Sequence, residues 1–538
     1  MSSKYDLVIK NGRIYDGSGG PCINGDIAVK DGKIAGIGEI SAAEASQKID
    51  AEGMAVSPGF IDAHSHVDLI AATLKNRDSQ IVQGVTTEVG GQCGLSLYPV
   101  NRERKSLLSS LLQQGTPKKG IVADFEWTDA SGFMDRIDKN AQPTDIALLT
   151  GHNAIRLAVM GYDNRKPNDD DIEEMKKLLR RDLDAGCVGM SSGLVFFPGC
   201  FADTEELVKL CKVVASCNKV YATHIRGEGS HSVQSVTEAI STAERSGVSL
   251  QISHHKVAKS CEGLSKDTLK LMDEAKKRGV DISFDVYPYT GGPSFLSTLL
   301  PRWASEGGLD RMLARLTSME DRERIKADLR SDNMTGWENI LKDTGYAEIM
   351  ITSFHSNPSL VGKTLLEIAD EQGKAPDDAL LDAILESSGE HNLILLPSSE
   401  SDMMNIIKHP LAMIGSDGWP QSMILPTAAN PHPRCFGTFP RVLGHISRDK
   451  ELFPLETAVY KMTGFPAWSY GLEDRGLIKE GLIADLVIFD PKTVNGSADS
   501  GNNPRQAPKG IYRVIKNGTV VVEDSCFLGQ SLGKAVRR

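Results

Sequence analysis

The chain has 538 residues, which is more than one ordinary small domain and close to a large barrel with an additional domain. Hydrophobic residues make up 40% and charged residues 24%, a balance that excludes disordered, collagen-like and coiled-coil chains. The net charge of −11 is unfavourable for binding nucleic acid.

Hydrophobicity and cysteine usage indicate the cellular setting. No run of eighteen apolar residues occurs, and Asp6 and Lys10 lie where a signal peptide would need an apolar core. The nine cysteines are an odd number and include no CxxC pair, which favours reduced thiols over disulfides. We therefore expect a cytoplasmic protein that does not contact a membrane.

The two ends of the chain have similar patterns. Short alternating apolar runs interrupted by Asn-Gly and Asp-Gly dipeptides, which favour tight hairpins, occur at 6–15, 25–38, 484–490 and 512–523. We predict a small β-sandwich domain formed by both termini, from residues 1–55 and 471–538. The alternative is two unrelated hairpin patches.

The long middle of the chain alternates between two kinds of segment. Strand-like apolar runs occur at 188–190, 220–224, 249–254, 280–286 and 413–417, and helical segments with charged faces at 170–185, 204–216, 234–246 and 266–278. This alternation predicts βαβ units and a parallel sheet. Since several strands end in ionisable residues, we predict an α/β protein with a (β/α)8 TIM-like barrel over 56–470. The segment at about 293–353 breaks the rhythm and is predicted to be a lid-like insertion over the barrel mouth.

Two early motifs offer metal ligands. In Pro58-Gly-Phe-Ile-Asp-Ala-His-Ser-His, residues i and i+2 of a strand share a face, so His64 and His66 would present two imidazoles together. An isolated HxH pair can also arise by chance. Cys93 lies among glycines, where the thiol can be approached closely, and is either a metal ligand or a nucleophile.

Three later strands also end in ionisable side chains. His224 and His254 follow strands separated by one helix, so both would lie at the same rim of the barrel. His255 must point the other way and is left out of the ligand set. Asp417 ends the last convincing strand, where a carboxylate can bind metal and accept a proton from water, unless it only caps a helix. Arg434 lies in a proline-framed loop and could grip a carboxylate, or be an ordinary surface arginine.

Taken together and in this order, the motifs resemble those of the amidohydrolase superfamily. PGFIDAHSH indicates the superfamily, and the glycine-flanked cysteine, SHHK and HPRCFGTFPR narrow the resemblance to the N-acyl-D-amino-acid deacylase (D-aminoacylase) branch. The resemblance implies zinc-dependent hydrolysis of the linear amide bond of a small-molecule N-acyl-D-amino acid, which gives a D-amino acid and a carboxylate. It also implies that a zinc-activated water would attack the amide, with Asp417 as general acid/base.

The resemblance also implies roles for individual residues. Cys93, His224 and His254 correspond to tight zinc ligands, and His64 and His66 with Asp417 to a second, weaker metal position. Lys256, Tyr287 and Arg434 correspond to the residues that hold the substrate's α-carboxylate.

Other functions remain open at this point. A cyclic amide hydrolase similar to hydantoinases and dihydropyrimidinases would keep the fold and metal, but it usually needs a carboxylated lysine, and none stands out. A D-peptidase or isopeptidase lies closer to the main prediction. A non-catalytic scaffold should lack ligands, whereas the full set is present. The sequence leaves the oligomeric state, the number of metals and the preferred side chain open.

Overall fold

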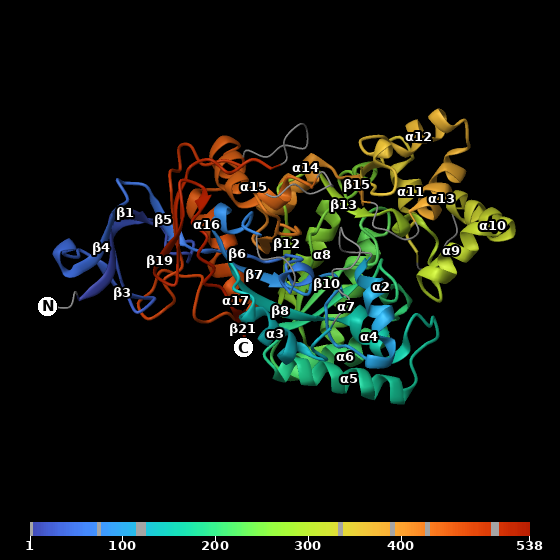
Figure 1. The fold of residues 1–538 in the computed structure, drawn as a ribbon, viewed down its shortest axis with the longest axis horizontal. Helices are drawn as coiled ribbons and strands as arrows, with labels where there is room; N and C mark the ends of the chain where they lie inside the picture. The colour runs from blue at the N-terminus through green and yellow to red at the C-terminus, as the bar shows by residue number, and fades with distance from the viewer. Residues whose placement is uncertain are drawn as a thin grey trace.

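The computed structural model describes residues 4–72, 77–113, 125–331, 337–387, 393–424, 431–496 and 505–538. Figure 1 shows an elongated molecule with a sheet from both termini at one end, a barrel in the middle and a mainly helical insertion at the other end. Among the helices in these ranges, none is long and apolar enough to cross a membrane.

Eight parallel strands form the barrel and follow one another in chain order: β6 (Phe60–Asp62), β7 (Val85–Gly90), β8 (Asp145–Gly151), β9 (Gly189–Gly193), β10 (Val220–His224), β11 (Ser249–Ile252), β12 (Ile282–Val286) and β16 (Ala412–Ile414). The first and last strands meet, because the Ala63 amide donates to the Ile414 carbonyl at 3.2 Å and the Asp417 amide to the His64 carbonyl at 2.7 Å. The predicted barrel is confirmed.

The helices between strands begin and end close to the predicted positions: α5 (Asp169–Asp184), α6 (Thr204–Ser216), α7 (Ser232–Ser246) and α8 (Ser265–Lys277). In α5, Asn168 and Asp171 form a capping box at the start. Its buried residues recur every three or four positions, at Ile172, Met175, Leu179 and Leu183. The other helices around the barrel are α1 (Asp68–Ala71), α2 (Lys105–Gln113), α3 (Ala130–Lys139), α4 (His152–Met160), α14 (Glu400–Lys408), α15 (Arg434–Arg441), α16 (Leu455–Met462) and α17 (Gly464–Tyr470).

The two ends of the chain form one nine-stranded sheet. The N-terminal part supplies five strands: β1 (Tyr5–Ile14), β2 (Ile23–Lys30), β3 (Lys33–Gly38), β4 (Ala45–Asp50) and β5 (Ala55–Pro58). The C-terminal part supplies four: β17 (Leu486–Phe489), β18 (Ile511–Lys516), β19 (Thr519–Glu523) and β20 (Cys526–Phe527). β17 joins the ends by pairing antiparallel with β5. Leu486 and Ile488 pack into the sheet's own core, and Val487 and Phe489 into the core shared with the barrel. The last strand of the chain, β21 (Ala535–Val536), is not part of this sheet but pairs in parallel with β8 of the barrel.

A buried lysine ties the terminal sheet to the barrel. Lys516 of β18 is fully buried, and its Nζ donates to Asp485 at 2.8 Å and to Asp145 of β8 at 2.5 Å. Burial alone would raise the pKa of Asp145, but Lys516 and Arg475 lower it below the ordinary value. The carboxylate of Asp145 is therefore ionised and depends on its cationic partners.

We expect Lys516→Met to lower the free energy of unfolding by about 3–5 kcal/mol, because removing one partner of a buried ion pair leaves uncompensated charge. The measurement is urea unfolding followed by circular dichroism. Lys30→Met is the matched control, since Lys30 pairs with Asp6 at 2.9 Å on the same sheet but both side chains are exposed. The control should lose less than about 1 kcal/mol. Equal losses for the two variants would show that the buried network is not what stabilises this junction.

The insertion between β12 and β16 is longer than predicted. It runs from β13 (Gly291–Phe295) through α9 (Leu309–Thr317), α10 (Met319–Arg330), α11 (Ile340–Thr344), β14 (Met350–Ser353), α12 (Leu365–Gln372) and α13 (Pro376–Glu386) to β15 (Leu393–Pro397). It has its own three-stranded sheet and its own apolar core. The predicted end at about 353 was wrong, because α12 and α13 have the apolar stripe of barrel helices but pack into the insertion's core.

Candidate metal centre and active site

The HxH pair lies just beyond the end of β6. His64 and His66 are buried, their ring centroids are 5.5 Å apart, and Ser65 between them forms a β-bridge with Gly418. The structure thus keeps both imidazoles on the pocket side, although the strand ends at Asp62, before the motif rather than within it.

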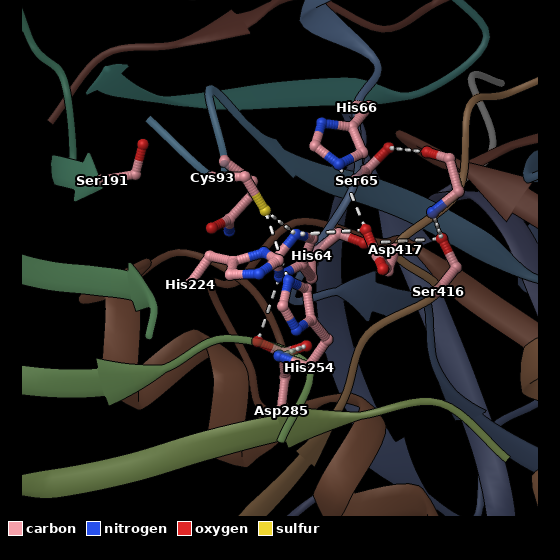
Figure 2. Close-up of polar contacts among 12 residues, drawn as sticks. His64, Ser65, His66, Cys93, Ser191, His224, His254, Asp285, Ser416 and Asp417 are labelled. Carbon is pink, nitrogen blue, oxygen red and sulfur yellow. Dashed lines mark hydrogen bonds and ion pairs between the residues drawn. The ribbon is translucent and has the colours of Figure 1, made fainter. Parts of the chain in front are cut away.

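A tight turn brings Cys93 to the same place. Its backbone has φ 56°, and its neighbours Gly91 and Gly94 also have positive φ. A Cβ on Gly94 would lie 2.2 Å from the Asn153 side chain, so the turn requires glycine there. The Cys93 Sγ consequently lies 3.4 Å from Nε2 of His64 and 3.4 Å from Nε2 of His254 (Figure 2).

His224 and His254 come from adjacent barrel strands, as predicted. His224 is the last residue of β10, His254 follows β11 by two residues, and their ring centroids are 4.4 Å apart. His255 points away from the pocket: its Nε2 pairs with the Thr268 hydroxyl at 3.0 Å, and burial lowers its pKa to about 3. Leaving His255 out of the ligand set agrees with this placement.

Asp417 completes the cluster from the opposite side. Its Oδ1 lies 3.1 Å from His66 Nε2 and 3.5 Å from His64 Nε2, and its Oδ2 accepts from Arg434 Nη1 at 2.7 Å. Burial alone would raise the pKa of Asp417, but Arg434 foremost holds it well below the ordinary value. Asp417, Cys93 and His254 all have positive φ, a strain of about 1–3 kcal/mol each that is common at functional sites.

The buried charges in this cluster support one another. Burial disfavours the Cys93 thiolate, but His64 and His254 outweigh burial and hold the pKa of Cys93 well below that of a free thiol. Burial likewise disfavours the His64 cation, while Asp285 and Cys93 raise its pKa well above the ordinary value. The cluster is therefore built to hold a thiolate.

The structure divides the predicted ligands differently from the sequence. Potential ligand atoms of His64, Cys93, His254 and Asp417 all lie within 4.8 Å of one another. A second group joins His224 and His254 to Glu228. His66 contacts the first group through Asp417, at 3.1 Å, and interacts with Cys93. All six predicted metal residues thus meet at one place, but Cys93 lies equally close to a member of each predicted set.

Arg434 lies in a helix and not in the predicted proline-framed loop, and it is buried, so it is not an ordinary surface arginine either. It is the first residue of α15, it follows Pro433, and only 1% of it is exposed. Proline is compatible with a helix start because the first amides have no acceptor within the helix, so a missing N–H breaks no helical hydrogen bond. The helix places the guanidinium against Asp417 and over the Tyr287 ring, at 5.1 Å from its centroid.

Lys256 and Tyr287 lie beside Arg434. Lys256 Nζ lies 5.9 Å from the centre of the Tyr287 ring and donates to Glu228 at 2.7 Å. The Tyr287 hydroxyl and Arg434 Nε are buried and have no hydrogen-bond partner among the described residues. The three predicted substrate-binding residues are thus brought together, and two of them have a buried polar atom without a hydrogen-bond partner among the described residues.

Two further carboxylates were not assigned by the sequence. Asp285, on β12, contacts His64 Nδ1 at 3.2 Å and the His254 amide at 2.9 Å. Glu228 contacts His254 Nδ1 at 3.1 Å. Carboxylates that hold the far nitrogen of a histidine orient it toward a metal. The signal for Asp285 was present, since it is a carboxylate near the carboxyl end of a barrel strand, as Asp417 is.

Most of these groups line an open cavity between the barrel rim and the insertion, with an empty volume of about 990 Å³ that includes its solvent-open mouth. Cys93, His224, His254 and Asp417 lie on its barrel side, and Lys256 and Arg434 add two cations. The insertion contributes Pro293, Phe295, Glu338 and Leu396. The cavity therefore combines a candidate metal centre, an anion-binding corner and a wall supplied by the insertion.

Comparison with known proteins places the chain in a family. The signature of the Amidohydrolase family matches residues 47–522. The D-aminoacylase of Alcaligenes xylosoxydans xylosoxydans is 34% identical over 538 residues, which cover 100% of this chain and 98% of that protein.

Solved structures agree with this likeness. The N-acyl-D-glutamate deacylase from Bordetella bronchiseptica, complexed with zinc and a phosphonate inhibitor that mimics the reaction's tetrahedral intermediate, has a TM-score of 0.82 at 31% identity and covers 99% of this chain and 100% of its own. A D-aminoacylase structure, reported in work on the functional role of its binuclear metal center, has a TM-score of 0.80 at 34% identity and covers 99% of this chain and 100% of its own. The L-hydantoinase from Arthrobacter aurescens shares the fold, with a TM-score of 0.56 at 18% identity and the same coverage. The chain belongs to the amidohydrolase family and, within it, to the N-acyl-D-amino-acid deacylase branch.

Proposed function

We propose that this protein is a zinc-dependent hydrolase that cleaves the amide bond of N-acyl-D-amino acids, releasing a D-amino acid and a carboxylate. One observation carries the proposal: a buried thiolate, histidines and Asp417 converge at one end of a cavity whose side bears two cations, Lys256 and Arg434, with the Tyr287 ring packed beside them. The full-length likeness to the D-aminoacylase supports the same reaction.

The donor set suits zinc. Zinc prefers thiolate and imidazole ligands, and tetrahedral bonds of about 2.3 Å to sulfur and about 2.0 Å to nitrogen separate these atoms by about 3.5 Å. The Cys93 Sγ lies 3.4 Å from Nε2 of His254 and also interacts with the His224 side chain, while Nε2 of His64 lies at the same distance of 3.4 Å. We propose one tight position held by Cys93, His224 and His254. A second, weaker position would use His64, His66 and Asp417.

Asp417 is placed to move the proton in the reaction. When bound, zinc would lower the pKa of water to about 7 and polarise an amide carbonyl. Asp417 is an ionised carboxylate that lines the cavity beside the candidate ligands, so it can accept the proton of the attacking water. It then returns a proton to the departing nitrogen, because an amine leaves poorly as an anion.

Lys256, Tyr287 and Arg434 form the proposed site for the α-carboxylate. The unused hydroxyl of Tyr287 and Nε of Arg434 are buried donors, which are costly to leave unpaired and suit an anionic ligand. Because these groups lie on one side of the candidate metal centre, a carboxylate held there allows only one enantiomer to direct its acyl group toward Asp417.

The rest of the cavity favours a neutral side chain. Lys256 is paired with Glu228, and Arg434 with Asp417. The remaining walls include several apolar side chains: Leu95, Val195, Phe196, Phe295, Ile340 and Leu396. We therefore expect N-acyl-D-leucine or N-acyl-D-methionine to be better substrates than N-acyl-D-glutamate.

The cyclic-amide alternative is less well supported. Cyclic amide hydrolases usually bridge two metals with a carboxylated lysine. In the described part of the cavity wall the single lysine is Lys256. Its Nζ contacts Glu228 and the Nδ1 of His254, the nitrogen that faces away from Cys93, so it is not placed to bridge two metals. The test compares zinc-loaded protein on N-acetyl-D-leucine, hydantoin and dihydrouracil. We expect turnover of the linear amide with kcat/KM at least about 100-fold above either ring. Faster hydrolysis of a ring would overturn the proposed function.

A further inference from the structure

One buried carboxylate of the insertion is held by the barrel. Glu338, just before α11, is 6% exposed and accepts three backbone amides from the loop after β10. The donors are Glu228, Gly229 and His231, each at 2.8 Å. Both carboxylate oxygens are therefore occupied by protein donors, which leaves Glu338 little capacity to bind a ligand itself.

The loop is shaped to receive this carboxylate. Asp343 of α11 accepts both the amide and the hydroxyl of Ser230, at 3.0 and 2.8 Å. A Cβ on Gly227 would lie 2.8 Å from a Glu338 oxygen, and one on Gly229 would lie 2.5 Å from an Asp343 oxygen. The two glycines therefore permit a close approach that a larger residue would block.

The opposite side of the same loop reaches the candidate active site. The Glu228 carboxylate contacts Lys256 Nζ at 2.7 Å and His254 Nδ1 at 3.1 Å. Thus Glu338 holds the backbone of Glu228, while the Glu228 side chain holds a predicted substrate-binding lysine and a predicted zinc ligand. A continuous series of short hydrogen bonds therefore leads from Glu338 of the insertion, through Glu228, to Lys256 and His254.

We propose that Glu338 is a positioning residue, and that docking of the insertion through Glu338 sets the placement of Lys256 and His254 by way of Glu228. The insertion then acts on substrate and metal binding and is more than a cover of the cavity. The part that concerns substrate rests on the proposed function, and the part that concerns docking and metal binding is independent of turnover.

Glu338→Gln tests the docking, because it keeps the shape but replaces an acceptor with a donor facing backbone amides. Glu348→Gln is the matched control, since Glu348 pairs with Lys259 at 2.9 Å across the same junction but is exposed. We expect the amides of Glu228, Gly229 and His231 to exchange hydrogen at least about tenfold faster in Glu338→Gln, and unchanged in the control. Unchanged exchange in Glu338→Gln would overturn the proposal.

Positioning is read by two further measurements on the zinc-loaded proteins. In competition with a chelator, Glu338→Gln should bind zinc about tenfold more weakly, because an outer carboxylate no longer fixes His254. Its KM for N-acetyl-D-leucine should rise about tenfold, with kcat changed less. In a double-mutant cycle with Lys256→Met, the two effects on KM should be non-additive.

The outcomes separate this proposal from the function itself. Faster exchange with unchanged zinc affinity would show that Glu338 only docks the insertion, and would overturn its positioning role. Additive effects on KM would exclude action through Lys256. If the wild-type protein hydrolysed no N-acyl-D-amino acid, the proposed function would fail, while hydrogen exchange and zinc affinity would still decide the role of Glu338.

Discussion

Asp417→Asn is expected to fold and retain zinc but to lose about 10²–10⁴-fold in kcat, which is the usual contribution of a positioned general acid/base. Asparagine preserves the shape and the acceptor toward Arg434, but it cannot take a proton from the attacking water. The measurement is the initial rate on N-acetyl-D-leucine beside the metal content of the same preparation.

Asp402→Asn is the control for replacing a buried carboxylate. Asp402 is fully buried, accepts the amides of Gly263 and Ser265, and does not line the cavity. This variant should keep its turnover even if its stability falls. An Asp417→Asn variant with wild-type kcat would remove Asp417 from the proton transfer.

Cys93→Ala should reduce zinc affinity by more than about 100-fold, because even the loss of an outer partner of a ligand costs about 10–100-fold. The alanine variant removes the thiolate that His64 and His254 stabilise, and hence the softest donor in the cluster. Metal analysis after gel filtration gives the bound zinc per chain, and activity should fall in proportion.

Cys211→Ala provides the comparison at another buried cysteine. Cys211 lies in the apolar core on α6, and burial alone raises the pKa of its thiol well above the ordinary value. We expect Cys211→Ala to be less stable but to keep its zinc. If Cys93→Ala bound zinc as tightly as Cys211→Ala, Cys93 would not be a ligand.

The barrel could be predicted because its signals are local. Helix periodicities in the middle of the chain predicted four helices whose ends lie within two residues of the observed ends of α5, α6, α7 and α8. The ionisable residues at strand ends were predicted to meet because parallel strands carry their carboxyl ends to one rim. His224, His254 and Asp417 do meet there.

The remaining features depend on contacts that periodicity does not encode. The helices α12 and α13 have an apolar stripe whether they pack on a barrel or on the insertion's own core, so the insertion's end at Pro397 could not be located. Arg434 was expected in a loop because prolines flank it, although proline also begins helices. Glu228, which pairs with Lys256, lies in a loop whose backbone is held by Glu338. Because Glu228 and Glu338 are 110 residues apart in the sequence, no local pattern indicates this contact.

The most direct test of the account is the ratio of kcat/KM for N-acetyl-D-leucine to that for N-acetyl-L-leucine on zinc-loaded protein. A carboxylate fixed by Lys256, Tyr287 and Arg434 presents only the D-enantiomer's amide to Asp417, so we expect a ratio of at least about 100. A ratio near or below one would contradict the account, because the same residues would then fail to select the enantiomer that the proposed function requires.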